Sequence, residues 1–175
     1  MEVVLGLDIS TSRIGVTVMD YDENLICCDV LKMDSKKELE DRCMDLENHI
    51  VSLSRKYPIK QIFIEQPFMM FSGGKTTAMT MSKLQRFNGM CSYMVRRLLD
   101  INPELIAANR ARSLNGIKVK RGEKTKKIVI DWVAKKYPKD FIFELTRHGN
   151  PKPGTDDRAD SVVIARAGII NLTNE

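Results

Sequence analysis

The chain has 175 residues, a formal net charge of +5 and 29% charged residues, enough length for one domain (1–175) that builds a core without disulfides. No run of about 18 apolar residues suggests a membrane span, the acidic Met1-Glu2 start is unlike a secretion signal, and the four cysteines lack metal-ligand spacing. These features favour a reduced, cytoplasmic protein, and the basic balance points mildly to polyanionic partners.

Three strands are predicted at the start of the chain. VVLGLDI (3–9), RIGVTVMD (13–20) and LICCDVLKM (25–33) are rich in apolar and β-branched residues, and the turn-like segments STS and YDEN separate them. Because the connections are short, we expect an antiparallel meander.

A helix and a fourth strand are predicted next. Residues 35–38 (SKKE) have the form of a capping box, in which Ser35 accepts from the first turn and Glu38 reaches back. Helical spacing of apolar residues follows, and Pro58 limits the helix. The residues with this spacing are Leu39, Cys43, Leu46, Ile50 and Leu53. KQIFIEQP (60–67) is read as a strand that ends at Pro67.

The second half of the chain alternates loops and helices. We expect a Gly-containing loop at 68–77, a long Met-rich helix at 79–98, a fifth strand in ELIAANRAR (104–112) and a helix at 126–137. Thr155 is expected to cap a final helix that runs to Ile170. Together these elements predict an α/β fold with a five-stranded mixed sheet flanked by helices.

Acidic residues stand at the ends of two predicted strands and in the last helix. Asp8 ends the first strand and Glu65 ends the fourth, the place where open α/β sheets present ligand sites. Asp157 and Asp160 are three residues apart and share one face of a helix. The dipole at the start of that helix can hold Asp156 and Asp157 ionised.

Taken singly, each of these acids has an ordinary structural explanation. Asp8 suits a turn, Glu65 a solvated strand end, and Asp156 or Asp157 a helix start. Taken together, they would cost burial energy unless a cation joins them. Oxygen ligands without His or Cys suit Mg²⁺ or Mn²⁺, and two such ions about 4 Å apart can drive phosphodiester hydrolysis.

Four motifs resemble, in the same order, the RuvC family of Holliday-junction resolvases. They are GLDISTSRIGVTVMD, IEQPF, ARSLNG with GEKTKKIV, and DDRADSVVIA, spread over nearly the whole chain. The resemblance implies an RNase H-like fold and a homodimer that uses two Mg²⁺ ions per site to cut four-way DNA junctions by paired nicks. Other branched DNA is a further candidate substrate. It places the metal ligands at Asp8, Glu65, Asp157 and Asp160, with Asp156 as the alternative to Asp157.

The resemblance also assigns roles to single residues. Lys124 falls on a lysine that supports the active site, and Phe68 on an aromatic that wedges into the branch point; a core aromatic is the alternative for Phe68. Asn115 replaces a second family lysine. The cations that would substitute for that lysine are Arg110, Arg112 and Lys118.

Two basic segments are candidate DNA contacts. FSGGKTT is not a Walker A loop, because Met69 stands where that motif needs glycine, but Lys75 can contact a phosphate. No nucleotide cofactor is therefore expected. Residues 118–127 carry a run of cations that is either a solvated face or a DNA-binding surface with salt-dependent affinity. The candidates there are Lys118, Lys120, Arg121 and Lys124.

Other functions stay open on the sequence alone. The Met-rich helix at 79–98 has more apolar surface than one core face requires, which suits either the family's dimer contact or a buried helix. A YqgF-like RNA-processing nuclease and a junction-binding protein without catalysis are the alternatives. Sugar kinases and actins share an Asp-containing first motif but need two domains, for which the chain is too short. No role is assigned to His148.

Overall fold

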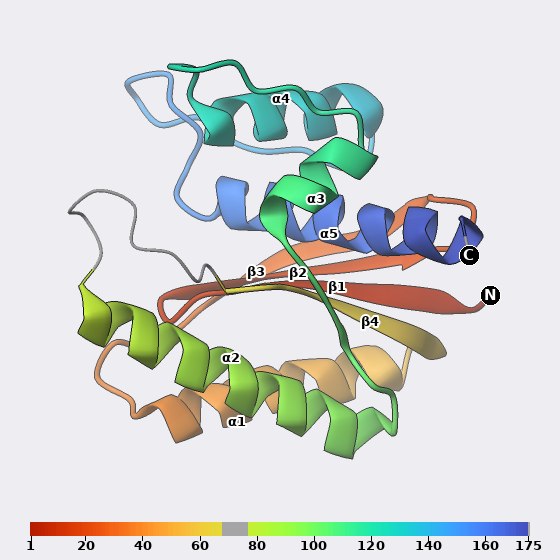
Figure 1. Cartoon of the computed structure of the whole chain (residues 1–175), viewed down its shortest axis with the longest axis vertical. Coiled ribbons are helices and arrows are strands. Elements are labelled where there is room, and N and C mark those ends of the chain that lie inside the picture. Colours follow the sequence, from red (N-terminus) through yellow and green to blue (C-terminus); the bar gives the residue numbers. More distant parts are fainter. Residues whose placement is uncertain (68–76, 175) are drawn as a thin grey trace.

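The computed structural model describes residues 1–67 and 77–174. They form a central five-stranded sheet between two layers of helices (Figure 1). The strand order is β3-β2-β1-β4-β5, with β1 antiparallel to β2, β2 antiparallel to β3, and β4 parallel to both β1 and β5. The strands are β1 (Val3–Ile9), β2 (Arg13–Asp20), β3 (Leu25–Lys32), β4 (Ile59–Glu65) and β5 (Glu104–Ile106). The predicted mixed sheet is confirmed.

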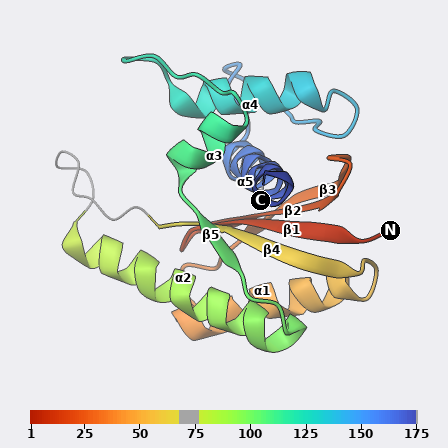
Figure 2. The same cartoon turned by 45° about the vertical axis from the view of Figure 1, so that its right-hand side comes forward.

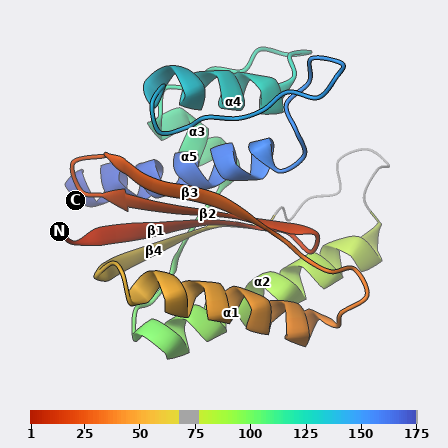
Figure 3. The same cartoon turned by 180° about the vertical axis from the view of Figure 1, so that it is seen from behind.

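Helices cover both faces of this sheet. The pair α1 (Leu39–Ser54) and α2 (Ala78–Leu99) lies on one face. On the other face α5 (Thr155–Thr173) packs against the strands, and α3 (Ala108–Leu114) and α4 (Thr125–Lys136) lie over α5 (Figure 3). Figure 2 shows the chain passing from α2 on the first face through β5 to α3 on the second. Among the described helices, none combines the length and apolarity that crossing a membrane requires.

Alternation along β1 decides which side chains face each helical layer. Val3, Leu5 and Leu7 belong to the core that β1 shares with α1 and α2. Val4 belongs to the core on the other face, and Gly6 lies against α5. The same alternation directs Asp8 toward the α5 layer, away from the core that β1 shares with α1 and α2.

Two glycines let α5 lie unusually close to the sheet. A methyl group on Gly6 would come within 2.5 Å of the Ser161 carbonyl oxygen, and one on Gly15 within 1.9 Å of the Asp157 carbonyl oxygen. Because α5 lies between the sheet and α3 and α4, it is apolar on nearly all sides. Its buried apolar residues include Ala159, Val162, Val163, Ile164, Ala165 and Ile169.

The structure corrects three of the predicted local features. Only residues 104–106 of the predicted fifth strand pair with the sheet, and residues 108–114 are helical. The first helix starts at Leu39 with Glu38 as its N-cap, so residues 35–38 form no capping box. The last helix has Gly154, at φ 96°, as its N-cap, and Thr155 donates its hydroxyl to the Lys152 carbonyl instead of capping.

A buried arginine explains why residues 35–38 do not form the predicted capping box. Arg42 of α1 donates to the carbonyls of Ser35 and Lys37 at 3.0 and 2.8 Å, which holds this segment in a turn ahead of the helix. Its other terminal nitrogen donates to the Thr11 carbonyl at 2.7 Å. Arg42 therefore ties the start of α1 to the turn between β1 and β2.

Candidate active site

Asp8 and Glu65 lie side by side at one end of the central strands. The parallel register pairs Leu7 with Ile64, so the next residue on each strand is one of the two acids. Alternation along β4 places Phe63 in the α5-side core, and Glu65, two residues later, points to the same side. Both carboxyl groups therefore lie on the face that α5 covers.

The first turns of α5 bring Asp157 and Asp160 to the same place. In Figure 1, β1 and β4 run toward the side of the molecule on which α5 begins. The helix is anchored there by the glycine contacts and by a hydrogen bond of 2.8 Å between the hydroxyls of Thr17 and Ser161, both fully buried. Asp8 is affected electrostatically by Glu65, Asp160, Asp157 and Asp156, so the predicted acids form one cluster.

Burial and mutual repulsion make these carboxyl groups hard to ionise. Burial, and then the charges of Glu65 and Asp160, raise the pKa of Asp8 well above its ordinary value. Burial and Asp160 raise the pKa of Glu65 to about 7. Burial and Asp156 raise the pKa of Asp160 to about 6 and also raise that of Asp157. A bound cation would relieve both effects.

Three cationic side chains border the cluster. Arg112 of α3 lowers the pKa values of Glu65 and Asp160, although burial outweighs it. Lys126 of α4 forms an ion pair with Asp156. Burial acts to raise the pKa of Asp156, but the hydrogen bond and charge of Lys126 hold it below its ordinary value. Arg13, at the start of β2, favours the ionised form of Asp157.

The donor set fits a hard divalent cation. Four carboxyl groups that oppose one another's ionisation, with no His or Cys among them, match the oxygen ligands of Mg²⁺ and Mn²⁺. As the side chains stand, no three His, Cys, Asp or Glu groups within residues 1–67 and 77–174 already surround one point at ligand distance. Binding therefore requires the carboxyl groups to turn toward the ion. Asp156 is paired with Lys126 while Asp157 is not, which favours Asp157 over Asp156 as the ligand.

The predicted DNA contacts separate into groups. Arg112 lies at the acid cluster, and Lys124 is the N-cap of α4, two residues before Lys126 of the Lys126–Asp156 pair. Lys118, Lys120 and Arg121 are exposed on the segment that leads into α4. Arg110 donates to Asn171 near the far end of α5, about 20 Å from Asp157 by the helical rise. Phe68 and Lys75 lie outside the described residues.

Sequence reasoning missed the role of Lys126 and of Asn115. The run of lysines at the start of α4 shows no preference for Lys126, and only its position against α5 selects it. Asn115 is buried and donates to the carbonyls of Ala111 and Val163, while it accepts from Arg166. Asn115 is therefore a packing residue that joins α3 to α5.

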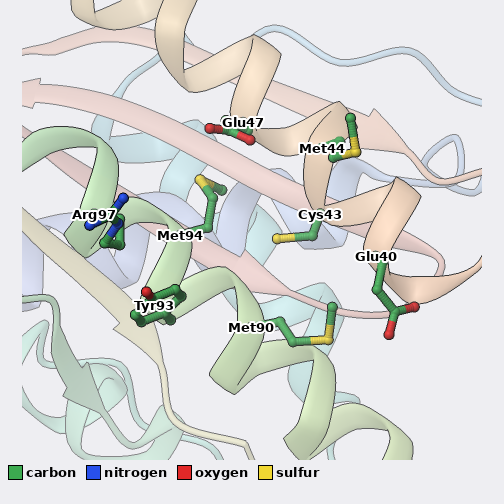
Figure 4. Close-up of a pocket in the computed structure, with 8 residues that line it drawn as sticks. All are labelled: Glu40, Cys43, Met44, Glu47, Met90, Tyr93, Met94 and Arg97. Carbon is green, nitrogen blue, oxygen red and sulfur yellow. The ribbon is translucent and has the colours of Figure 1, made fainter.

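The face opposite the acid cluster carries exposed apolar residues on α1 and α2. A hollow of about 400 Å³ lies between the two helices, and Figure 4 shows Met90, Tyr93 and Met94 from α2 meeting Cys43 and Met44 from α1 around it. The exposed fraction is 68% for Tyr93 and 58% for Met44. The broad apolar surface predicted for the Met-rich helix is thus partly unburied.

Comparison with known proteins identifies the fold. No protein-family model and no curated protein matches the sequence. Among solved structures, Thermus thermophilus RuvC in complex with Holliday junction substrate superposes with a TM-score of 0.71 at 12% identity, covering 99% of this chain and 96% of that one. Thermus thermophilus RuvC alone gives 0.67 at 15% identity, covering 98% and 96%. The yeast mitochondrial Holliday junction resolvase gives 0.61 at 15% identity, covering 95% and 77%. The chain has the RuvC-type, RNase H-like fold that its sequence predicts.

Proposed function

We propose that the chain is a metal-dependent, structure-selective DNA endonuclease that resolves four-way junctions by paired, symmetric nicks. The observation that carries this proposal is the cluster of Asp8, Glu65, Asp157 and Asp160 on the face that β1 and β4 present to α5. It lies in a fold shared, over nearly the full length of the chain, with proteins described as Holliday junction resolvases. The whole chain, 1–175, acts as one nuclease domain, and its free cysteines fit a reducing, cytoplasmic compartment.

The acid cluster would hold two Mg²⁺ ions, or Mn²⁺ in their place, with Asp8, Glu65, Asp157 and Asp160 as the residues that supply the ligands. Bound ions of this kind neutralise the charge that develops on a phosphodiester during hydrolysis. Lys126 fixes Asp156 at the edge of the cluster. Arg112, near Glu65 and Asp160, adds positive charge on the side of α3, where it can bind the phosphate of the strand to be cut.

The DNA surface extends from this site along α3 and the start of α4. Arg112, Lys118, Lys120, Arg121 and Lys124 supply its positive charge, and affinity for the junction should fall steeply with salt. Phe68, just beyond Glu65 and outside the described residues, is proposed as the wedge at the branch point, and Lys75 as a phosphate contact. Arg110 is distant and would reach only an outer part of a junction arm.

A second copy of the chain would cover the hollow between α1 and α2. Its apolar lining is rimmed by both signs of charge, Glu40 and Glu47 from α1 and Arg97 from α2, which suits a self-complementary contact (Figure 4). Such a homodimer places two acid clusters on one junction. Paired nicks on opposing strands then follow from the symmetry.

Cleavage of end-labelled DNA tests the proposed function. Four-way, three-way, flap and linear DNA, and a four-way RNA, are incubated with the native chain and Mg²⁺ and resolved on denaturing gels. We expect symmetric nicks in the four-way DNA, and the cleavage rate should fall by at least about 100-fold in Asp8→Asn and Asp160→Asn. Asp22→Asn, a matched change in an exposed turn, should cleave at the native rate. Binding of junctions without metal-dependent cleavage would contradict catalysis, and cleavage of RNA alone would identify an RNA-directed nuclease.

A further inference from the structure

A second pocket, of about 740 Å³, opens beside the acid cluster. It lies between the first turns of α4, the segment 143–153 and the start of α5. Its size falls within the range that binds compact organic ligands. Asp156 forms part of its wall, so the pocket and the acid cluster meet at the Lys126–Asp156 pair.

The wall formed by residues 143–153 is an ordered hairpin. Leu145 bridges to Pro151, the Thr146 N–H donates to the Asn150 carbonyl at 2.7 Å, and the Lys152 N–H donates to the Glu144 carbonyl at 2.9 Å. Phe143 packs against Phe141 with ring centroids 6.0 Å apart. The pocket is therefore built by hydrogen bonds and aromatic packing, without help from a ligand.

The lining of the pocket is chemically complementary to a nucleotide. Apolar side chains, Ile130, Phe143 and Leu145 among them, offer surface to a base. Four lysines line the pocket: Lys126 and Lys127 are ion-paired with Asp156 and Asp131 of the lining, Lys152 is ion-paired with Glu144, and within the described residues Lys124 has no ion pair. Leu145 is 55% exposed, so its contact surface is open to a ligand. Apolar surface next to lysines is the combination by which proteins bind single-stranded nucleic acid, with bases on side chains and phosphates on cations.

The position of the pocket relates this chemistry to the substrate. Asp156 faces the pocket while Asp157 and Asp160, on the same turns of α5, belong to the acid cluster. A strand whose phosphate is held by the cluster would reach this pocket by passing Lys126. Bases next to a branch point are easier to unpair than those within an arm.

We propose that this pocket receives one unpaired nucleotide of the cut strand, next to the phosphate that is cleaved. The base lies against Phe143 and Leu145, and its phosphate against Lys124 and Lys152. This inference rests on the proposed nuclease function and adds to it a device that selects the cleavage position. Cleavage then occurs preferentially at the phosphate next to a base that unpairs easily or fits the pocket well.

A fluorescent base tests the proposal directly. Four-way junctions carry 2-aminopurine at single positions flanking the mapped nick, and each is bound by the Asp8→Asn chain so that it is not cut. Emission should rise severalfold at one position only, because the base leaves the stack. Adding Leu145→Ala or Lys152→Gln should return the emission to that of the free junction. The matched controls, Ile142→Ala, which is 71% exposed and outside this pocket, and Lys139→Gln, should keep the rise.

An abasic site at the same position provides an independent readout. Compared with the intact junction, the abasic junction should bind the Asp8→Asn chain about tenfold more weakly. The Asp8→Asn, Leu145→Ala chain should bind the abasic and the intact junction equally. The pocket proposal is overturned if the native chain cuts junctions but no flanking position shows a rise, or if Leu145→Ala leaves the rise intact; the nuclease function then stands. A native chain that cuts no junction instead overturns the proposed function, and the pocket proposal with it.

Discussion

Gly15 of β2 lies directly beneath the backbone of Asp157 in α5, so close that a methyl group on Gly15 would come within 1.9 Å of the Asp157 carbonyl oxygen. Backbone atoms on both sides leave no flexible side chain to move aside. The distance between the sheet and the acid-bearing turn of α5 is thus set by the absence of a single side chain.

Gly15→Ala should therefore displace the first turns of α5. We expect a loss of roughly 1 to 3 kcal/mol or more in unfolding free energy, as for other overpacked sites, and a loss of cleavage larger than stability explains. Chemical denaturation and single-turnover cleavage measure the two effects. The control is Gly89→Ala on α2, where no atom lies within 4 Å of the added methyl; it should be neutral or stabilise the helix by up to about 1 kcal/mol. Equal unfolding free energies and cleavage rates in Gly15→Ala and Gly89→Ala would contradict the proposal that Gly15 sets the position of α5.

The metal-free protein should lose stability as pH rises from about 4 to about 7. Glu65 and Asp160 ionise in the unfolded chain near their ordinary values of 4.5 and 3.8, but in the folded chain only near 7 and 6. Across this window the folded state holds more protons, so the unfolding free energy falls with pH, by about 3 kcal/mol for each of the two groups. Asp156, whose pKa is lowered, acts in the opposite direction and only below about pH 4.

Thermal unfolding in EDTA between pH 4 and pH 8 measures this slope. Adding Mn²⁺ at pH 7.5 should restore much of the lost stability, because the ion takes the place of the protons. Asp160→Asn should be more stable than the native chain at pH 7.5 in EDTA and should gain less from Mn²⁺. A flat pH profile, or equal Mn²⁺ shifts in both proteins, would mean that the acids are not a shared cation site.

Lys126→Gln should slow cleavage more than Lys124→Gln. Lys126 contacts Asp156 at the acid cluster, so its loss changes the charge of the cluster, and we expect a reduction of about 100-fold in the single-turnover rate. Lys124 stands two residues before Lys126, at the N-cap of α4, and its loss should mainly reduce the salt dependence of junction binding, as the loss of one phosphate contact does. A larger rate loss in Lys124→Gln would instead support the catalytic role that the family resemblance assigns to Lys124.

Tyr93→Glu should separate the proposed dimer. The change places a charge on an exposed ring of α2 at the hollow shared with α1, where a second copy would have to desolvate it. Light scattering should show a monomer, and junctions should receive single nicks in place of paired ones. Tyr21→Glu, on the turn between β2 and β3 and outside this hollow, is the control and should remain dimeric. A native chain that is already monomeric would refute the dimer.

The sequence patterns predicted the sheet and the acid cluster because both depend on strong local signals. Residues 3–9 and 59–65 are nearly all apolar, which leaves Asp8 and Glu65 conspicuous. The helix α3 was predicted as a continuation of β5 because seven residues are too few to show a helical period, although Ala and Arg favour helix. The failed capping box has a tertiary cause, since Arg42 holds the carbonyls of Ser35 and Lys37.

The sequence also does not show which lysine at the start of α4 faces α5, because that too depends on tertiary contacts. A shift of one or two residues in the start of a helix decides which side chain faces its neighbour, and local propensity does not fix that start. Here the helix begins at Thr125, which turns Lys126 toward α5. The pocket beside it depends in turn on a hairpin whose bridge joins Leu145 to Pro151, a contact without a periodic signature.

The placement of α5 also has a consequence during protein synthesis. Asp8 and Glu65 are translated early, whereas Asp157 and Asp160 belong to the last helix, which also fills the core between the sheet and α4. A chain on which α5 has not yet docked thus lacks half of the acid cluster and much of its packing at the same time. Under the proposed function, such a chain would be unable both to hold the metal ions and to reach native stability.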